Sequence, residues 1–334
     1  MKILILGGSQ FIGRHVTDAI LKNTGGRANI THANRGKTKP DGIPGVSHLR
    51  FDRSNENPDE LKGLQQDWDI VIDLSAYFPR QVEFVLDGLK GRIGRYVFCS
   101  TISAYRESLG STHPKKSSVW MTEASELLPC SPEQAVDTSM MTYGNKKAEC
   151  ERVILKRTHQ AATIIRPSVV YGAHDPTDRF AYWIARATGK SRYLLPENGI
   201  TITQKTYGPD LGQAFWLAAT KPQAVGRAYN IADQEPLSLR DSLKVMGSLD
   251  NAVSASAEFL ESNGVRPWMD LPLWIPSTHF LVDTFQARSD LGFTSTPSDL
   301  AAQAACDAFL AEARAPKTGL SLEAESEILR KLHI

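Results

Sequence analysis

The sequence predicts an α/β fold: a doubly wound parallel sheet with a smaller, interwoven C-terminal lobe. From residue 1 to residue 100, short apolar runs typical of strands alternate with segments whose apolar residues recur at helical spacing. The first apolar run, 2–6, leads directly into two glycines and then into a helical pattern. Alternation of this kind indicates strand–helix–strand crossovers, which cover both faces of a parallel sheet with helices.

The elements follow from these patterns in chain order. We expect strands at 2–6, 28–33, 46–51, 69–74, 95–99 and 163–170, and helices at 11–21, 61–64, 82–89 and 143–156. The polar stretch 107–139 is predicted to be a loop, and the alternation weakens after Gly172, where segments rich in Pro, Trp and Tyr follow. The expected domains are a dinucleotide-binding domain over 1–172, with returning segments near 203–235 and 277–293, and a substrate lobe made mainly of 173–202 and 236–334.

Composition and charge exclude several classes of protein. The 334 residues include 38 Lys plus Arg and 37 Asp plus Glu, a formal net charge of +1, which makes a nucleic-acid partner unlikely. No apolar stretch approaches the length of a membrane span, so we expect no membrane association and a cytoplasmic location. The cysteines form no CxxC pair and no His/Cys cluster has metal-ligand spacing, so no metal is expected.

The glycine turn between the first strand and helix carries the first chemical signal. It reads GGSQFIG, and a strand, a glycine turn and a helix bring backbone N–H groups and the positive end of the helix dipole to one point. A dinucleotide pyrophosphate is the natural anion there, and the alternative is a turn that uses glycines for geometry alone. Gln10 occupies the middle glycine position of a GxxGxxG pattern, where its Cβ could crowd the phosphate. The cofactor-binding residues predicted in this turn are Gly7, Ser9, Gln10, Phe11, Ile12 and Gly13.

The tips of the second and third strands bear on the choice of cofactor. The acidic residue that would bind the adenosine ribose is absent after the second strand, where the chain reads NRGK from Asn34 to Lys37. Arg35 suits a 2′-phosphate, so the sequence favours NADP over NAD; a solvated basic loop is the alternative. Asp52 fits as a partner for the adenine amino group, and equally as a helix N-cap or turn residue.

A tyrosine and a lysine four residues apart form the predicted catalytic pair. Tyr143 and Lys147 would share one face of a helix, where both can reach a ligand lying alongside. A neighbouring ammonium and an oxidised nicotinamide favour the phenolate, which can then exchange a proton with an alcohol or ketone. Thr101 would lie at the carboxyl end of the preceding strand and could hydrogen-bond the reacting oxygen, with Ser103 next in line. Loop capping is the alternative for these two hydroxyls.

Five motifs in order carry a family resemblance: GGSQFIG (7–13), DLSAY (73–77), CSTISAY (99–105), YGNKK (143–147) and RPSVVYGAHDPTDR (166–179). Together they resemble the extended short-chain dehydrogenase/reductases, specifically the NAD(P)-dependent epimerase/dehydratase group. Weaker likeness at 229–231 and 287–293 extends the resemblance over nearly the whole chain. Gln10 departs from the pattern, and the turn followed by an NRG loop also resembles an atypical branch that includes chloroplast stem-loop RNA-binding proteins.

The resemblance implies a Rossmann domain with an NAD(P) cofactor and a smaller substrate lobe. It further implies a Thr101–Tyr143–Lys147 triad, with Lys147 also holding the nicotinamide ribose. The resemblance also implies a homodimer paired through helices and a nucleotide-sugar substrate. Residues expected to line the cofactor cleft by this likeness are Leu74, Ser75, Ala76 and Pro167.

The sequence leaves two functions of different classes. The leading hypothesis is an oxidoreductase or epimerase that transfers hydride to or from a secondary alcohol or ketone; whether it acts as a reductase or an epimerase stays open. His174 and Arg179 follow the fifth motif in a loop predicted to face the cleft, where they would contact substrate or form an ion pair that orders the loop. The rival hypothesis is a non-catalytic or RNA-binding protein on the same fold.

Overall fold

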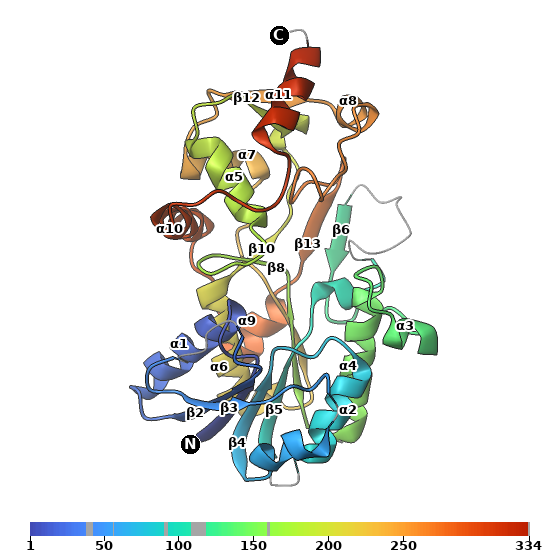
Figure 1. The fold of residues 1–334 in the computed structure, drawn as a ribbon, viewed down its shortest axis with the longest axis vertical. Coiled ribbons are helices and arrows are strands. Elements are labelled where there is room, and N and C mark those ends of the chain that lie inside the picture. Colours follow the sequence, from blue (N-terminus) through green and yellow to red (C-terminus); the bar gives the residue numbers. More distant parts are fainter. Residues whose placement is uncertain (38–42, 56, 90–92, 108–117, 159–160, 333–334) are drawn as a thin grey trace.

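A doubly wound parallel sheet organises the lower half of the molecule in Figure 1. The computed structural model describes residues 1–37, 43–55, 57–89, 93–107, 118–158 and 161–332. The chain begins at β1 and builds the sheet outward in both directions, which confirms the fold class predicted from the alternating pattern. In spatial order the strands are β11 (Ala228–Ile231), β7 (Thr163–Pro167), β5 (Ile93–Cys99), β4 (Trp68–Asp73), β1 (Lys2–Leu6), β2 (Asn29–Asn34) and β3 (Ser47–Arg50).

Helices cover both faces of this sheet, and β1 shows why. Ile3 and Ile5 point into a core beneath α1 (Ile12–Thr24), α6 (Gly208–Thr220) and α9 (Phe285–Leu291). Leu4 and Leu6 point to the opposite face, into a core beneath α2 (Pro79–Gly88), α4 (Tyr143–Arg157) and the 3-10 helix Pro58–Leu64. Successive residues of a strand face opposite sides, so a continuous apolar run is the pattern that two covered faces require.

The second lobe forms the upper half of the molecule and has its own aromatic core, with Trp183 and Trp274 fully buried. Three strand pairs, all parallel, connect segments remote in the sequence. They are β8 (Val169–Tyr171) with β10 (Lys205–Tyr207), β9 (Tyr193–Pro196) with β12 (Ala252–Ala255), and β6 (Ser118–Met121) with β13 (His279–Val282). The lobe's helices are α5 (Arg179–Thr188), α7 (Leu239–Met246), α8 (Ala257–Ser262), α10 (Ser298–Ala311) and α11 (Leu322–Lys331).

Three segments differ from the sequence prediction. The expected loop 107–139 contains β6 and a short helix, α3 (Pro132–Val136), while its part 108–117 lies outside the described residues. The expected strand 163–170 divides at Ser168, whose N–H donates to the Ile231 carbonyl and to Thr206 Oγ1. The segment after Gly172 is more regular than expected, since it forms α5, which buries Phe180, Tyr182 and Trp183.

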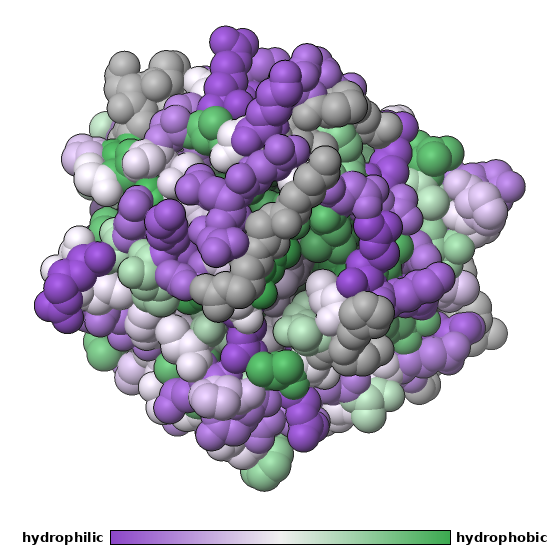
Figure 2. Space-filling model, turned by 90° about the horizontal axis from the view of Figure 1, so that it is seen from below, coloured by the Kyte–Doolittle hydropathy of each residue, from purple (hydrophilic) through white to green (hydrophobic). Residues whose placement is uncertain are grey.

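The lower end of the molecule, viewed in Figure 2, is mostly hydrophilic, with hydrophobic side chains in small groups between the polar ones. Within the described residues, no helix combines the length and apolar character needed to cross a membrane. The same part of the chain contains no group of three or more His, Cys, Asp or Glu side chains placed to hold a metal ion.

Candidate functional site

The glycine turn lies at the carboxyl edge of the sheet, between β1 and the first turn of α1. Gly7 has a φ of +91°, a conformation that residues with a Cβ rarely adopt. A Cβ on Gly13 would lie 2.6 Å from the Gly7 carbonyl oxygen, so only glycine lets α1 begin this close to the turn. Gln10, which replaces the middle glycine, is exposed, and its side chain does not fill the core beneath the turn. The turn therefore keeps the form of a phosphate cradle.

The loop after β4 packs against this turn. A Cβ on Gly7 would lie 2.8 Å from Ser75 Cβ, which sets Ser75 directly beside the glycine. Leu74 N–H donates to the Leu6 carbonyl (3.0 Å), so the loop continues the register of the sheet past the end of β4. The structure thus brings the predicted cofactor residues of the first and fourth strands into contact.

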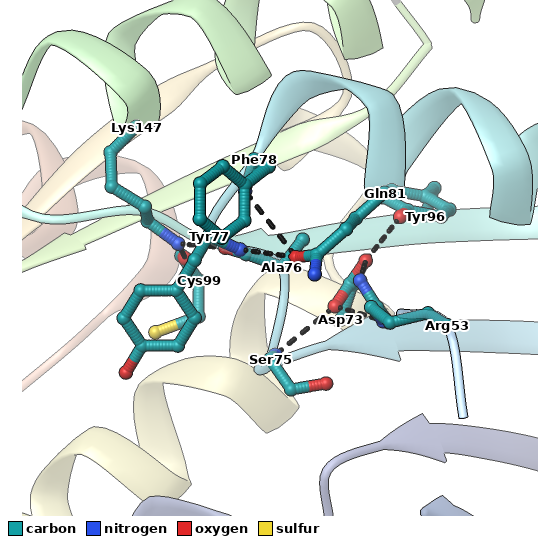
Figure 3. A network of polar contacts seen from close by, with 10 residues as sticks. All are labelled: Arg53, Asp73, Ser75, Ala76, Tyr77, Phe78, Gln81, Tyr96, Cys99 and Lys147. Atoms are coloured by element: carbon teal, nitrogen blue, oxygen red, sulfur yellow. Dashed lines mark hydrogen bonds and ion pairs between the residues drawn. The ribbon is translucent and has the colours of Figure 1, made fainter. Parts of the chain in front are cut away.

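A buried ionic network holds this loop in place (Figure 3). Asp73, at the end of β4, accepts two hydrogen bonds from the Arg53 guanidinium (3.0 Å each) and one from the Tyr96 hydroxyl (2.9 Å). Its Oδ1 also accepts the N–H of Ser75 (3.1 Å). Asp73 is fully buried and Arg53 nearly so, which makes this pair a rigid support for the loop.

Lys147 connects α4 to the same loop. Its ammonium donates to the carbonyl oxygen of Ala76 (2.9 Å) and to that of Cys99 at the end of β5. The Nζ atom also lies 4.2 Å from the Phe98 ring centroid and 5.7 Å from that of Tyr77. Figure 3 shows the side chain reaching down between the two strand ends. Lys147 is buried, and its carbonyl partners replace the water that a buried ammonium would lose.

Tyr143 is the first residue of α4 and lies beside Thr101. The Thr101 side chain acts to lower the pKa of the Tyr143 phenol, and Thr101 Oγ1 accepts the N–H of Ser103 (3.1 Å). Gly144 makes this approach possible, because a Cβ there would overlap the Ser103 carbonyl oxygen. The structure therefore brings the three members of the predicted triad to one edge of the sheet.

The electrostatic setting of Tyr143 differs from the one expected. Burial raises the pKa of Tyr143 far above its ordinary value, and the nearby Tyr77 and Cys99 act in the same direction. The side chain of Thr101 and the charge of Arg179 oppose that rise. Lys147 was expected to be the cation favouring the phenolate, but its ammonium is directed to backbone carbonyls. Arg179 is a side chain whose positive charge acts to lower the pKa of the phenol.

Lys146, the neighbour of Lys147, orders the chain that leads into Tyr143. Its buried ammonium donates to the carbonyl oxygens of Asp137 and Ser139 (2.9 Å for Ser139) and lies 4.8 Å from the Phe78 ring centroid. The adjacent lysines thus hold two parts of one loop, since Lys147 binds Ala76 two residues before Phe78. Sequence analysis gave Lys146 no role, because two lysines in a row on a helix resemble a solvated face.

The loop 172–178 joins the second lobe to the glycine turn. His15 Nε2 is hydrogen-bonded to the Ala173 carbonyl oxygen (3.0 Å), and Arg14 Nη1 lies 3.1 Å from His174 Nδ1. His174, predicted to contact substrate, is exposed and directed toward α1. Arg179 begins α5, and its positive charge acts to lower the pKa of Tyr143. Of the two predicted substrate contacts, Arg179 contacts Thr177 and Trp268 and acts on Tyr143 through its charge, and His174 contacts the first turns of α1.

The predicted adenosine-binding residues lie apart from the triad. Arg35 is exposed in the loop after β2, where Asn34 Oδ1 accepts the N–H of Gly36 (2.9 Å) and lies 2.6 Å from His48 Nε2. Asn34 also donates to Ser9 Oγ (3.0 Å), which connects this loop to the glycine turn.

Two further predicted cofactor residues lie at strand ends. Asp52 follows β3, and its Oδ1 accepts the N–H of Ser54 (3.0 Å), the turn-residue role considered as an alternative. Pro167 is buried at the carboxyl end of β7, the strand that pairs with β5, so it shares the edge from which Thr101 follows.

A second buried network joins α4 to β7 and was missed by sequence analysis. Arg166 on β7 donates to both carboxylate oxygens of Glu151 on α4, and its Nη1 donates to the Tyr105 hydroxyl (2.8 Å). Tyr105 in turn donates to Asn230 Oδ1 (2.7 Å). The available signal was a charged residue, Arg166, within an apolar strand and another, Glu151, on the helix that begins at Tyr143. Their pairing depends on the order of strands in the sheet, which the sequence pattern does not give.

Comparison with known proteins assigns the chain to a family. The sequence profile of the NAD dependent epimerase/dehydratase family matches residues 3–232, which contain the glycine turn, the triad and both networks. The chain belongs to this family. The resemblance seen in the sequence motifs is thereby confirmed, and a nicotinamide cofactor is the one that the family uses.

Solved structures with the same fold include enzymes of nucleotide-sugar metabolism. UDP-glucuronic acid 4-epimerase from Bacillus cereus, in complex with NAD, superposes with a TM-score of 0.68 at 19% identity, covering 92% of this chain and 96% of that one. The dTDP-glucose 4,6-dehydratase from Bacillus anthracis, also in complex with NAD, gives a TM-score of 0.66 at 15% identity, covering 93% and 97%. At these identities the likeness establishes the fold.

One relative has a name that indicates a different role. The chloroplast stem-loop binding protein of 41 kDa b from Arabidopsis thaliana is 25% identical over 247 residues, which cover 70% of this chain. The matched region spans 59% of that relative's length.

Proposed function

We propose that this chain catalyses hydride transfer between a nicotinamide cofactor and a secondary alcohol or ketone, with Tyr143 as the acid/base. One observation carries the proposal. The helix bearing Tyr143 and Lys147 is joined through Ala76 to the loop that packs on the glycine turn. This link supports a single site that would hold both the proton-exchanging group and the pyrophosphate.

The residues present fit a dinucleotide. The positive φ of Gly7 and the tight approach of Gly13 are the features that a pyrophosphate cradle needs. Gly7 to Gly13 would hold the pyrophosphate, Leu74 to Ala76 and Pro167 would line the cleft, and Lys147 would hold the nicotinamide ribose. When bound, the nicotinamide ring accepts or returns hydride and, in its oxidised form, adds a positive charge near Tyr143.

Tyr143 would move the proton. Its phenolate oxygen takes the hydroxyl proton of an alcohol, and the phenol returns it to a ketone in the reverse direction. Burial alone keeps the phenol protonated, so Thr101, Arg179 and the oxidised cofactor are the groups that favour the phenolate. Thr101 would also orient the reacting oxygen, since its side chain acts on Tyr143 and is held by the N–H of Ser103.

Nucleotide sugars are the proposed substrate class. MoeE5, with 19% identity and a TM-score of 0.66, was solved with UDP-glucose and NAD, and again with UDP-glucuronic acid and NAD. A reductase and an epimerase would use the same triad; they differ in whether the reduced cofactor returns hydride to the same substrate.

Replacing Tyr143 by Phe tests the proposal. Tyr143→Phe should retain cofactor binding and lose turnover by about 10²-fold or more, since it removes the exchangeable proton and keeps the ring. The measurement is dihydronicotinamide absorbance in a single turnover with nucleotide sugars and simple ketones. Tyr77→Phe is the matched control, because its ring packs against Tyr143 with centroids 5.8 Å apart. Equal activity in Tyr143→Phe and wild type, or no redox activity in the wild type on any member of the panel, would contradict the proposal.

We also propose that the chain prefers NADP to NAD. The absence of an acidic residue at the tip of β2 and the exposure of Arg35 support this preference, because a guanidinium binds a 2′-phosphate well. Arg35→Ala should weaken NADP binding far more than NAD binding, as measured by calorimetry. Equal losses for the two cofactors would refute the role of Arg35.

RNA binding is the second candidate, favoured by the similarity to a stem-loop binding protein. The balanced charge of the chain disfavours it, because RNA affinity rests largely on phosphate contacts. A mobility shift with a stem-loop RNA at physiological salt tests it. Tight binding together with an inactive redox site would replace the first proposal with this one.

A further inference from the structure

Three side chains form a chain of hydrogen bonds from the outermost strand, β3, to the glycine turn. His48 Nε2, on β3, lies 2.6 Å from Asn34 Oδ1 at the end of β2, and Asn34 Nδ2 lies 3.0 Å from Ser9 Oγ. The sheet register allows these contacts, because His48 pairs with His32 and Asn34 lies two residues further along β2, on the same face. An exposed histidine is thereby connected to the turn that has the form of a phosphate cradle.

The glycine turn packs against this same face of β2. A Cβ on Gly8 would lie 2.4 Å from His32 Cδ2, so Gly8 lies directly against the His32 ring. Thr17 Oγ1, on α1, lies 2.9 Å from His32 Nε2 and holds that ring in place. The next residue of the turn, Ser9, contacts Asn34. Two successive residues of the turn therefore contact two successive same-face residues of β2, which fixes the position of Ser9.

The chemistry of the groups sets the direction of each hydrogen bond. The Gly36 N–H donates to Asn34 Oδ1 (2.9 Å), which identifies this atom as the amide oxygen. His48 Nε2 must therefore carry a proton and donate to the same oxygen. The amide nitrogen can only donate, so Ser9 Oγ accepts from Asn34. Among the residues that the structure describes, Ser9 Oγ makes no other hydrogen bond, so its own proton is left for a ligand.

We propose that His48 and Asn34 are positioning residues for the nucleotide, which hold the Ser9 hydroxyl as a hydrogen-bond donor to a phosphate oxygen. The inference rests on the proposed function, since a dinucleotide at the glycine turn supplies the phosphate. That phosphate has two sources in the cofactor: the pyrophosphate, and the 2′-phosphate that NADP carries and NAD lacks.

The identity of residue 34 matters because it decides where the Ser9 proton goes. Asn34 ends β2, where an acidic residue would accept hydrogen bonds from the adenosine ribose. A carboxylate there would take the Ser9 proton for itself, because a carboxylate only accepts hydrogen bonds. The amide donates to Ser9 and leaves that proton for the ligand. His48 holds the amide in this orientation, since it donates to the amide oxygen.

Calorimetry with ADP-ribose, adenosine 2′-phosphate and adenosine tests the proposal, because these probes carry the pyrophosphate, the 2′-phosphate and no phosphate. Ser9→Ala should weaken binding of a phosphate probe by about tenfold or more, the effect of losing a hydrogen bond to a charged group. His48→Phe should weaken the same probe by about 3- to 10-fold, because it removes one hydrogen bond that holds Asn34. A loss on ADP-ribose alone assigns the acceptor to the pyrophosphate. A loss on adenosine 2′-phosphate alone assigns it to the 2′-phosphate.

Three comparisons separate positioning from a general effect on the fold. Adenosine should bind His48→Phe as it binds wild type, and a loss as large as that on the phosphate probes overturns the proposal. In the Ser9→Ala background, His48→Phe should change affinity by less than about twofold, because the two residues act through one hydrogen bond to the ligand. The same loss with and without the Ser9 hydroxyl overturns the coupling. His48→Gln keeps an N–H that can donate to Asn34 and should restore binding, and an affinity as low as that of His48→Phe overturns the role of this donor.

The outcome for the proposed function is separate. Unchanged affinities in His48→Phe and Ser9→Ala overturn this inference, even in a chain that transfers hydride. Binding that depends on Ser9 and His48, in a chain that never reduces its cofactor, supports this inference and contradicts the proposed function alone. No binding of any probe to the wild type overturns both.

Discussion

Asp73→Asn removes the charge at the centre of the buried network and keeps the shape of the side chain. In the native protein this carboxylate neutralises Arg53, accepts the Tyr96 hydroxyl and holds the Ser75 N–H. The exposed fractions of the Arg53 and Asp73 side chains are 7% and 0%, so water cannot replace the lost charge. Removing one partner of such a buried pair costs about 3–5 kcal/mol, because the remaining charge stays buried without compensation.

Urea unfolding followed by circular dichroism measures this loss. With an m-value of about 3 kcal/mol per M, the midpoint should fall by about 1 to 1.7 M. Cofactor affinity should fall as well, because Ser75 packs against Gly7.

Two variants control the measurement. Glu126→Gln breaks an exposed ion pair with Arg106. The side chains of Glu126 and Arg106 are 67% and 45% exposed, so the free energy of unfolding should fall by less than about 1 kcal/mol. Adding Arg53→Met to Asp73→Asn removes the unpaired guanidinium and should restore more than half of the lost stability. A loss below about 1 kcal/mol in Asp73→Asn, equal to that in Glu126→Gln, would refute the buried network as the support of the loop.

Two further predictions concern residues that touch the turn and the triad. Lys146→Met should lower turnover by about tenfold and leave cofactor affinity unchanged, because it frees the chain before Tyr143 while Lys147 keeps its carbonyl partners. Steady-state kinetics measure the effect, with the exposed Lys156→Met as the control. Equal turnover in the two variants would contradict the prediction. Burial of His32 beneath Gly8 lowers its pKa to about 4, and the unfolded value is about 6.5. The neutral ring therefore contributes stability that is complete above about pH 6.5 and is lost as the pH falls toward 4. Melting temperatures of wild type and His32→Gln should converge over that range, and a His32 proton resonance titrating near pH 6.5 would show that the reasoning is wrong.

The sheet and much of the site could be predicted because their signals are local. The strand at Lys2–Leu6 and the turn after it could be predicted without knowledge of distant residues. The strand, the turn and the following helix all lie where they were expected. The spacing of Tyr143 and Lys147 on one helix was local in the same sense.

The rest of the site depends on contacts between residues that are remote in the sequence. Asp73 meets Arg53 only because β4 and the chain after β3 end at one edge of the sheet, and Glu151 meets Arg166 across the packing of α4 on β7. The direction of the Lys147 ammonium, toward the carbonyl oxygens of Ala76 and Cys99, likewise follows from where two strands end. No spacing rule contains that information.

The structure of this protein crystallised with NADP or NAD tests the central claim most directly. The account predicts the pyrophosphate against Gly7 to Gly13, the nicotinamide ribose hydrogen-bonded to Lys147, and the Tyr143 hydroxyl facing the reactive carbon of the nicotinamide ring. A nucleotide bound away from the glycine turn, or a ring separated from Tyr143 by the side chain of Gln10, would contradict it.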